Sequence, residues 1–201
     1  MDHRMNREEW RMQRASVLVM GVMLLAIGST CRAQSSASLD CSKAVSTTAK
    51  MVCSDKGLAA LDGKMSELYA ATGKSPAVIA QQRRDLFRAD NCGSASDTHA
   101  CVETAYQRRI IALEIEQGKA GKAISAKYNC GAAVKNFSAS FYNSTEPQSV
   151  MLVNGRDHAV ALIAMSGSGS RYTAPGIEYW EHQGEAAVTW RGAKMTCKIV
   201  R

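Results

Sequence analysis

A short run of hydroxyl and glycine residues, Ser166-Gly167-Ser168-Gly169-Ser170-Arg171-Tyr172, carries the most unusual side-chain chemistry in the sequence. It lies between two strand-like stretches and offers hydroxyl groups followed by a cation and an aromatic ring. Such a composition is typical of a flexible hairpin loop, which is its plainer interpretation. A nucleophile is not indicated, because Ser168 lacks the Gly-x-Ser-x-Gly spacing and the strand-to-helix turn that this motif requires. His182, taken alone, is typical of a solvated strand residue.

Cysteine is the second residue type that could do chemistry. Seven are present, and six of them follow residue 33. These six are Cys41, Cys53, Cys92, Cys101, Cys130 and Cys197. An even number in a small exported protein predicts disulfides. A metal site is not predicted, since no pair has Cys-x-x-Cys spacing and only three histidines accompany them.

Residues 1–33 have the features of a cleaved signal peptide. Several arginines precede the apolar run 15–27, which is shorter than the roughly 20 residues that a spanning helix needs. Small residues at Cys31 and Ala33 predict cleavage before Gln34 and a periplasmic or secreted protein. In the less favoured alternative, Cys31 is acylated and the protein is a lipoprotein attached to the membrane.

The charge narrows the possible partners. The whole chain carries a net charge of +7, and removal of residues 1–33 takes away five arginines and three acidic residues, which leaves +5. Export excludes nucleic acid as a partner, and solvation accounts for most of this modest basic excess. The sequence predicts no cofactor and no metal.

The elements that position these residues fall into two halves with different periods. Apolar residues recur every three or four positions in 58–69 and 102–113, and Ser75-Pro76 starts a further helix over 77–89. The sequence thus predicts a helical domain over 39–116 and, from its glycines, a linker over 117–125.

From residue 126 to residue 201 the apolar period changes to two. Alternation predicts strands at 137–141, 186–190 and 195–199, and Asn154-Gly155 predicts a type I′ hairpin turn between 150–153 and 159–164. Short strands with tight turns indicate a small antiparallel barrel or sandwich. The fold class is therefore α+β in two domains.

Position along the chain predicts three disulfides. Cys130 with Cys197 would join the first and last strands of the second half. In the helical half an antiparallel hairpin would bring Cys53 to Cys92, and Cys41 with Cys101 follows by elimination.

The second half resembles the membrane-bound and periplasmic inhibitors of c-type lysozyme over residues 126–201. The matching pieces are Lys127 to Cys130, Asn154-Gly155, the run from Ser166 to Tyr172, Gly176 to Trp180, Glu185-Ala186 and Cys197-Lys198. The resemblance implies an eight-stranded antiparallel barrel whose Ser/Gly loop enters the active-site cleft of the enzyme.

The same resemblance implies the binding residues, which are Ser166, Gly167, Ser168, Gly169, Arg171, Tyr172 and His182. Ser168 would supply a hydroxyl donor. His182 stands where the family usually has a lysine, so a side chain that is mostly neutral above about pH 6.5 replaces a permanent cation.

The helical half resembles the N-terminal domain of the LprI type of lysozyme inhibitor over residues 40–113. The matching residues are Asp40, Cys41, Cys53, Leu58, Leu61, Asp62, Tyr69, Gln82, Arg83, Arg88, Cys92, Cys101, Tyr106, Arg109, Ile110 and Leu113. Most of these are framework positions, so they argue for fold and disulfides more than for a site.

The expected function is therefore that of an exported inhibitor whose partner is a c-type lysozyme, and not that of an enzyme. The alternative is a non-catalytic envelope or adhesion module that recognises peptidoglycan or an acidic surface component.

Overall fold

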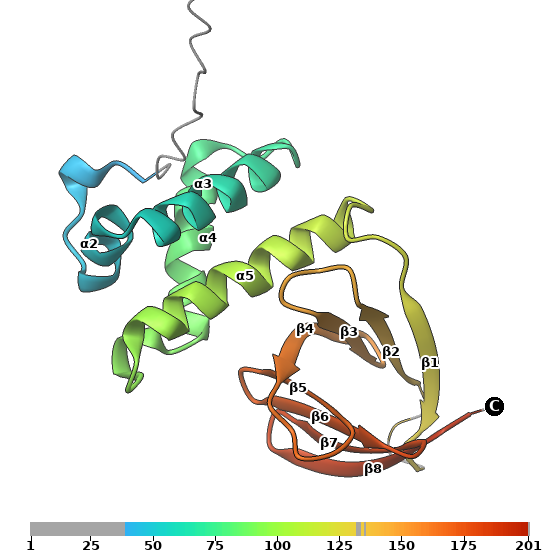
Figure 1. Ribbon diagram of the computed structural model, residues 1–201. Helices are drawn as coiled ribbons and strands as arrows, with labels where there is room; N and C mark the ends of the chain where they lie inside the picture. The colour runs from blue at the N-terminus through green and yellow to red at the C-terminus, as the bar shows by residue number, and fades with distance from the viewer. Residues whose placement is uncertain (1–38, 132–133, 135, 201) are drawn as a thin grey trace, which may run out of the picture. The chain divides into compact units, whose positions relative to one another are not determined.

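The computed structural model describes residues 39–131, 134 and 136–200. These residues belong to one compact unit, residues 35–201, in which a helical part precedes a β-barrel (Figure 1). The expected signal peptide, including Cys31, lies outside the described residues. None of the described helices is long and apolar enough to cross a membrane.

The helical part begins with a short 3-10 helix and continues through four α-helices with a second 3-10 turn. The elements are η1 (Cys41–Lys43), α2 (Thr47–Ser54), α3 (Lys56–Ala70), α4 (Pro76–Ala89), η2 (Cys92–Ser94) and α5 (Thr98–Glu116). Ser46, Asp55, Ser75 and Asp97 cap the four α-helices, each accepting a backbone N–H from the first turn. The predicted helical character is confirmed, and α2 is an addition.

Buried apolar faces of these helices surround one buried acid. Asp62 of α3 is fully buried, and Tyr106 of α5 donates its hydroxyl to Asp62 Oδ1 at 2.9 Å. The amide of Leu39 donates to Asp62 Oδ2 at 3.0 Å, and Arg83 Nε lies 3.4 Å from Oδ1. Burial, with the charge of Asp62, raises the pKa of Tyr106 far above its usual value. The phenol therefore stays protonated and donates.

Eight antiparallel strands follow and close into a barrel in chain order. They are β1 (Ile124–Asn129), β2 (Phe137–Tyr142), β3 (Ser149–Asn154), β4 (Asp157–Ala164), β5 (Ser170–Ala174), β6 (Ile177–His182), β7 (Glu185–Trp190) and β8 (Ala193–Ile199). Closure rests on a short seam, where β1 pairs with β8 through Tyr128 with Ile199 and Asn129 with Lys198, and the Val200 amide donates to the Lys127 carbonyl at 2.8 Å. The eight-stranded barrel implied by the resemblance is confirmed.

Aromatic side chains fill the barrel because alternate residues of each strand point inward. Tyr179 is fully buried, and its ring lies 6.3 Å from that of Tyr172 and 6.5 Å from that of Phe137. The hydroxyls of Tyr128 and Tyr179 lie 2.6 Å apart and share a hydrogen bond. Burial raises the pKa of Tyr179 far above its usual value, so the pair remains neutral.

The turns between strands place glycine where the backbone needs a positive φ. The β3–β4 hairpin exists, but its central residues are Gly155 and Arg156, since Asn154 pairs with Asp157. The predicted turn at Asn154-Gly155 is therefore displaced by one residue. It is also not of type I′, because that type needs two positive φ values and only Gly155, at 63°, has one. Two consecutive positive φ values occur instead at Gln183-Gly184, between β6 and β7, and at Arg191-Gly192, between β7 and β8.

The helical part packs on the outer face of the barrel through α5. Ile111 of α5 is buried against Val160 and Leu162 of β4, with Ala112, Ile115 and Met151 at the edge of the cluster. The helix ends at Glu116 and β1 begins at Ile124, so residues 117–123 connect the two parts. The domain boundaries themselves stay a prediction.

All six cysteines form disulfides, but two of the three predicted pairs are wrong. Cys130 does pair with Cys197, at an S–S distance of 2.01 Å. The other bridges are local: Cys41 pairs with Cys53 at 2.09 Å, and Cys92 with Cys101 at 2.06 Å.

The physical reason for the correction is local chain reversal. Cys53 lies on α2, which the sequence pattern does not reveal, and η1 folds back beside that helix. After α4, Asn91 takes a left-handed conformation with φ 55°, and η2 turns Cys92 toward the first turn of α5. The predicted hairpin geometry considered only the long helices.

Removal of the Cys130–Cys197 bridge should destabilise the protein more than removal of Cys92–Cys101. The first closes a loop with a sequence separation of 67 and the second one of 9, so loop entropy predicts losses of about 4 and about 3 kcal/mol. Urea unfolding of the two double Cys→Ala variants, compared with the wild type, measures this. A larger loss in the Cys92/Cys101 variant would contradict the prediction.

Candidate functional site

The Ser/Gly loop spans residues 165–169 between β4 and β5 and is held by its own hydrogen bonds. Ser166 Oγ donates to the carbonyl oxygen of Ser168 at 2.6 Å, and the Ser168 amide donates back to Ser166 Oγ at 3.4 Å. The indole Nε1 of Trp180, on β6, donates to the same Ser168 carbonyl at 2.8 Å. Two side chains, Ser166 and Trp180, therefore hold the loop at the Ser168 carbonyl.

Gly169 allows the loop to lie directly against β6. Its φ is +69°, and a Cβ added there would stand 2.1 Å from the carbonyl oxygen of Glu181 and 3.2 Å from Cβ of His182. Only glycine fits this approach. Gly167, by contrast, has no atom within 4 Å of an added Cβ and faces open space.

The two serines of the loop have different tasks. The hydroxyl of Ser166 is occupied within the loop, whereas Ser168 Oγ makes no hydrogen bond to any residue that the structure describes. Ser168 is exposed. Its hydroxyl is thus presented from a fixed backbone and is available to donate to a partner.

Arg171 and Tyr172 support the base of the loop from opposite sides of β5. Arg171 Nε lies 2.7 Å from Glu178 Oε1, and its NH1 donates to the carbonyl of Met165 at 3.4 Å. Tyr172 points into the barrel and is only 4% exposed. Any part it has in recognition must therefore come from positioning the loop rather than from direct contact.

His182 lies at the end of β6, beside the loop. Its side chain is exposed and makes no hydrogen bond or ion pair with the residues that the structure describes. Together with Trp180, Gln183, Glu185 and Ala187 it borders a shallow hollow of about 450 Å³. The barrel thus brings Gly169 of the loop beside His182 of β6.

Two further residues of this site were not expected from the sequence. Met165, at the start of the loop, is 94% exposed, and Trp180 is 43% exposed. Strand alternation could have revealed Trp180, because Glu178, Trp180 and His182 form the outward row of β6 while Ile177 and Tyr179 point inward. The position of Met165 depends on the loop conformation, which no periodicity encodes.

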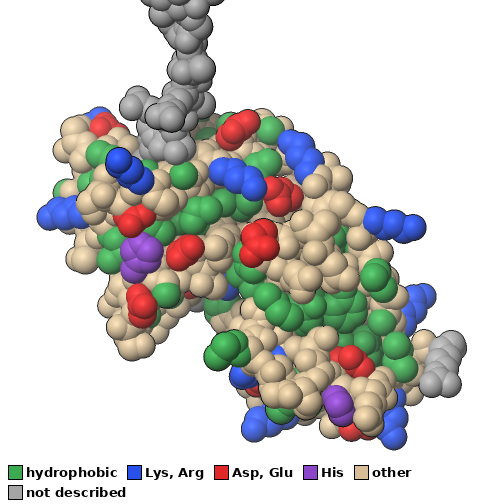
Figure 2. All heavy atoms as spheres, viewed as in Figure 1, with side chains coloured by type: hydrophobic (Ala, Val, Ile, Leu, Met, Phe, Trp, Pro, Cys, Tyr) green, Lys and Arg blue, Asp and Glu red, His purple; other side chains and the backbone are tan. Residues whose placement is uncertain are grey.

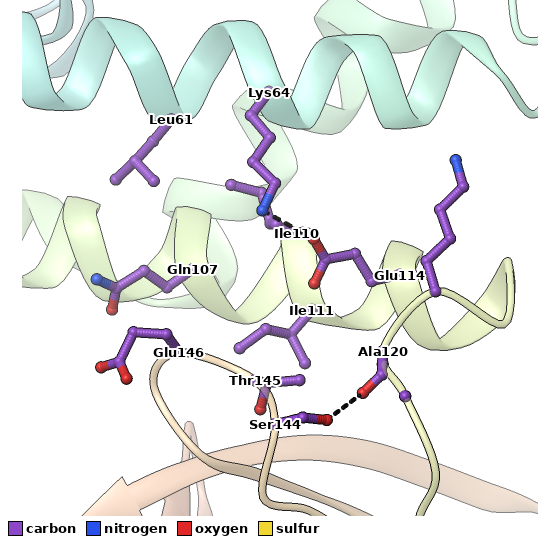
Figure 3. A pocket seen from close by; sticks show the side chains of 12 residues that line it. Leu61, Lys64, Gln107, Ile110, Ile111, Glu114, Ala120, Ser144, Thr145 and Glu146 are labelled. Carbon is purple, nitrogen blue, oxygen red and sulfur yellow. Dashed lines mark hydrogen bonds and ion pairs between the residues drawn. The ribbon is translucent and has the colours of Figure 1, made fainter.

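A second hollow, of about 430 Å³, lies between α3, α5 and the β2–β3 loop (Figure 3). Two of its charged groups are paired, since Lys64 Nζ lies 2.8 Å from Glu114 Oε1, and Ser144 donates to the carbonyl of Ala120 at 2.9 Å. These contacts make it a structural junction between the helices and the β2–β3 loop.

A third hollow, of about 560 Å³, lies beside the ion pair of Asp90 and Arg108. Burial raises the pKa of Asp90 above the usual carboxyl value, against the opposing effect of Arg108. Within the described residues no three His, Cys, Asp or Glu side chains are placed to hold a metal ion. Figure 2 shows charged side chains of both signs scattered over the visible face rather than gathered in one patch.

Comparison with known proteins identifies relatives of both parts of the chain. Residues 128–196 match the family described as membrane-bound lysozyme-inhibitor of c-type lysozyme. The chain is 35% identical over 164 residues to proteins named Lipoprotein LprI from Mycobacterium bovis and from two strains of Mycobacterium tuberculosis. These matches cover 80% of this chain and 83% of each relative. No solved structure matches the chain.

Substitution of the two loop glycines should distinguish Gly169, which the backbone conformation requires, from Gly167, which it does not. Gly169→Ala should destabilise the protein by about 1 to 3 kcal/mol, because the new Cβ would collide with the Glu181 carbonyl at a left-handed φ. Gly167→Ala, its matched control, should change the free energy of unfolding by less than about 0.5 kcal/mol. Urea unfolding of both variants measures this. Equal effects would show that the loop does not depend on the approach of Gly169 to β6.

Proposed function

The chain belongs to the LprI family, and from this membership and the geometry of its loop we propose that the exported protein inhibits a c-type lysozyme. In this proposal the loop of Ser166, Gly167, Ser168 and Gly169 enters the active-site cleft of the enzyme. Arg171 and Tyr172 hold the loop, and His182 contacts the enzyme beside it. The match of residues 128–196 to the lysozyme-inhibitor family supports the choice of partner.

One observation carries the proposal: a free hydroxyl stands on a fixed loop. Two side chains hold the Ser168 carbonyl, from Ser166 at 2.6 Å and Trp180 at 2.8 Å, while Ser168 Oγ has no partner among the described residues. A loop already fixed in one conformation loses little entropy when it binds. The slim glycines on either side of Ser168 leave room for it in a narrow cleft.

The chemistry of the target suits these groups. Lysozymes cleave glycosidic bonds with two carboxyl groups, one held protonated and one ionised. A hydroxyl can donate to the ionised carboxylate, and such a bond to a charged group contributes about 1.5 to 3 kcal/mol. A protonated imidazole at His182 would add a second, charge-assisted donor.

Net charge contributes little to this recognition. A mature chain at +5 gains no long-range attraction to a c-type lysozyme, because these enzymes are strongly basic. Charged side chains of both signs lie interspersed on the visible face (Figure 2), so no single acidic patch on that face compensates for this. Affinity must then come from short-range fit at the loop.

The proposed activity is binding and not catalysis. In the described part of the chain, Ser168 has no histidine hydrogen-bonded to its hydroxyl, and a serine nucleophile needs such a base. We also propose that the protein is exported to the cell envelope. The relatives are named lipoproteins, which supports acylation at Cys31 as an alternative to cleavage before Gln34. Mass spectrometry of the mature N-terminus distinguishes these two forms.

Ser168→Ala should weaken lysozyme inhibition by about ten- to a hundredfold, the equivalent of one hydrogen bond to a charged group. The melting temperature should not change, because Ser168 Oγ has no partner in the described part of the chain. Ser96→Ala, at an exposed serine of the helical part, is the matched control. Inhibition constants and thermal melts of the three proteins test the proposal. Full inhibition by Ser168→Ala would exclude the hydroxyl as the contact.

His182→Lys should strengthen inhibition at pH 8 by about two- to fivefold, in the range of an exposed ion pair. An ordinary imidazole is charged at pH 5.5 and mostly neutral at pH 8, whereas an ammonium is charged at both. The affinity that depends on the imidazole charge is therefore present in acid and lost as the pH rises. Inhibition constants of wild type and variant should converge near pH 5.5, after correction for the pH dependence of the enzyme. Equal constants at pH 8 would mean that His182 makes no charged contact.

A further inference from the structure

The outer surface of β6, β7 and β8 shares Trp180 and His182 with the loop site and continues beyond it across two further strands, and we propose that it binds a neutral glycan chain stacked on Trp180. We call this surface the Trp180 face. It consists of the outward side chains Glu178, Trp180, His182, Glu185, Ala187, Thr189, Lys194, Thr196 and Lys198. The proposal rests on the geometry of this surface and not on the proposed inhibition of lysozyme.

The indole of Trp180 is exposed and also immobile. Its exposed fraction is 43%, which is large for a residue of this size. Its Nε1 donates to the Ser168 carbonyl at 2.8 Å, so the ring cannot turn without breaking that bond. A fixed and exposed aromatic ring offers a flat apolar platform at little entropic cost on binding.

Hollows lie on two sides of this ring. One of about 410 Å³ is bordered by Glu178, Thr189, Lys194 and Thr196, and one of about 450 Å³ by His182, Gln183 and Glu185. Both are also lined by Trp180 and Ala187. The platform is therefore the centre of an extended shallow trough rather than the wall of one closed pocket.

Strand register explains why the trough stays open. Trp180 pairs with Ala187 of β7, and Ala187 pairs with Thr196 of β8. The side chains beside the indole are thus small, and a ligand that lies on the ring meets no obstacle across two further strands. The rows on either side are polar, because Glu178 pairs with Thr189 and Thr189 with Lys194, while His182 pairs with Glu185.

This combination matches the chemistry of a sugar ring. A pyranose has one face of C–H groups, which pack on an indole, and a rim of hydroxyls, which exchange hydrogen bonds with carboxylate, hydroxyl and ammonium groups. A hydrophobic peptide would need a larger apolar surface, and the neighbours of Trp180 on this face are small or polar.

The charges favour a neutral glycan over an anionic polymer. Glu178 lies 2.7 Å from Arg171, and Glu185 lies 3.9 Å from Lys198. The carboxylates thus offset the cations around the trough, and no strong field of one sign covers it. Chains of N-acetylated aminosugars without carboxyl groups carry no net charge and meet this requirement.

The test uses the mature protein and the tetramer of β-1,4-linked N-acetylglucosamine as probe. The chain contains only three tryptophans, and removal of residues 1–33 leaves Trp180 and Trp190, of which Trp190 is buried. The indole N–H signals in an ¹H–¹⁵N spectrum therefore report each ring separately. Titration should move the Trp180 signal saturably and leave the Trp190 signal nearly unchanged.

Ala187→Arg should weaken this binding by about tenfold or more, because a long side chain would fill the trough beside the ring. Ala77→Arg, at an exposed alanine of α4, is the matched control and should bind like the wild type. Neither substitution removes the hydrogen bond between Trp180 and Ser168, so a change in glycan binding would not be caused by its loss. Lysozyme inhibition is measured on the same proteins.

Three results would overturn the proposal. The first is that the tetramer produces no saturable shift of the Trp180 signal. The second is that Ala187→Arg binds the tetramer as tightly as the wild type does. The third is that an anionic polysaccharide such as heparin shifts the same signal at lower concentration and loses this effect in high salt. A protein that binds the tetramer but does not inhibit lysozyme would refute only the proposed inhibition.

Discussion

Closure of the barrel at the seam between β1 and β8 is the constraint on which the rest of the molecule depends. Only two residue pairs join these strands, whereas six pairs join β2 to β3 and six join β6 to β7. The Cys130–Cys197 bridge lies at the same seam and supplies covalently what the short ladder lacks. A closed barrel has no free sheet edge, and aromatic side chains fill its interior.

Packing inside the barrel in turn determines the orientation of side chains on its outer surface. Tyr179 and Trp180 are neighbours on β6, one fully buried among aromatic rings and the other directed outward. Because adjacent residues of a strand point to opposite faces, packing of Tyr179 sets the orientation in which Trp180 meets the Ser168 carbonyl. Core packing and loop conformation are therefore coupled through a single strand.

Much of the fold could be predicted from the sequence, because it follows from apolar periodicity. The change of period between residues 116 and 124 separates the helices from the strands, and the pair Cys130–Cys197 follows from its place at both ends of the barrel. The helical disulfides could not be predicted in this way. Cys53 and Cys92 are positioned by the short elements α2 and η2, which are too short to show a period.

The candidate site divides in the same manner. The composition of the Ser/Gly run marks its location, but it does not distinguish Ser166, whose hydroxyl is used internally, from Ser168, whose hydroxyl is free in the described part of the chain. Nor does it reveal that Tyr172 is buried. The first distinction arises from hydrogen bonds within the loop, and the second from the inward position of Tyr172 on β5.

The sequence separations of the disulfides also bear on the order in which the bridges can form. A chain that emerges from its N-terminus completes Cys41–Cys53 after 12 further residues and Cys92–Cys101 after 9, whereas Cys130 waits 67 residues for Cys197. The two local bridges can consume the thiols of Cys41, Cys53, Cys92 and Cys101 before Cys197 emerges. Of the fifteen pairings open to six cysteines, vectorial emergence thus favours the native set, and the thiol of Cys130 meets its partner without competitors.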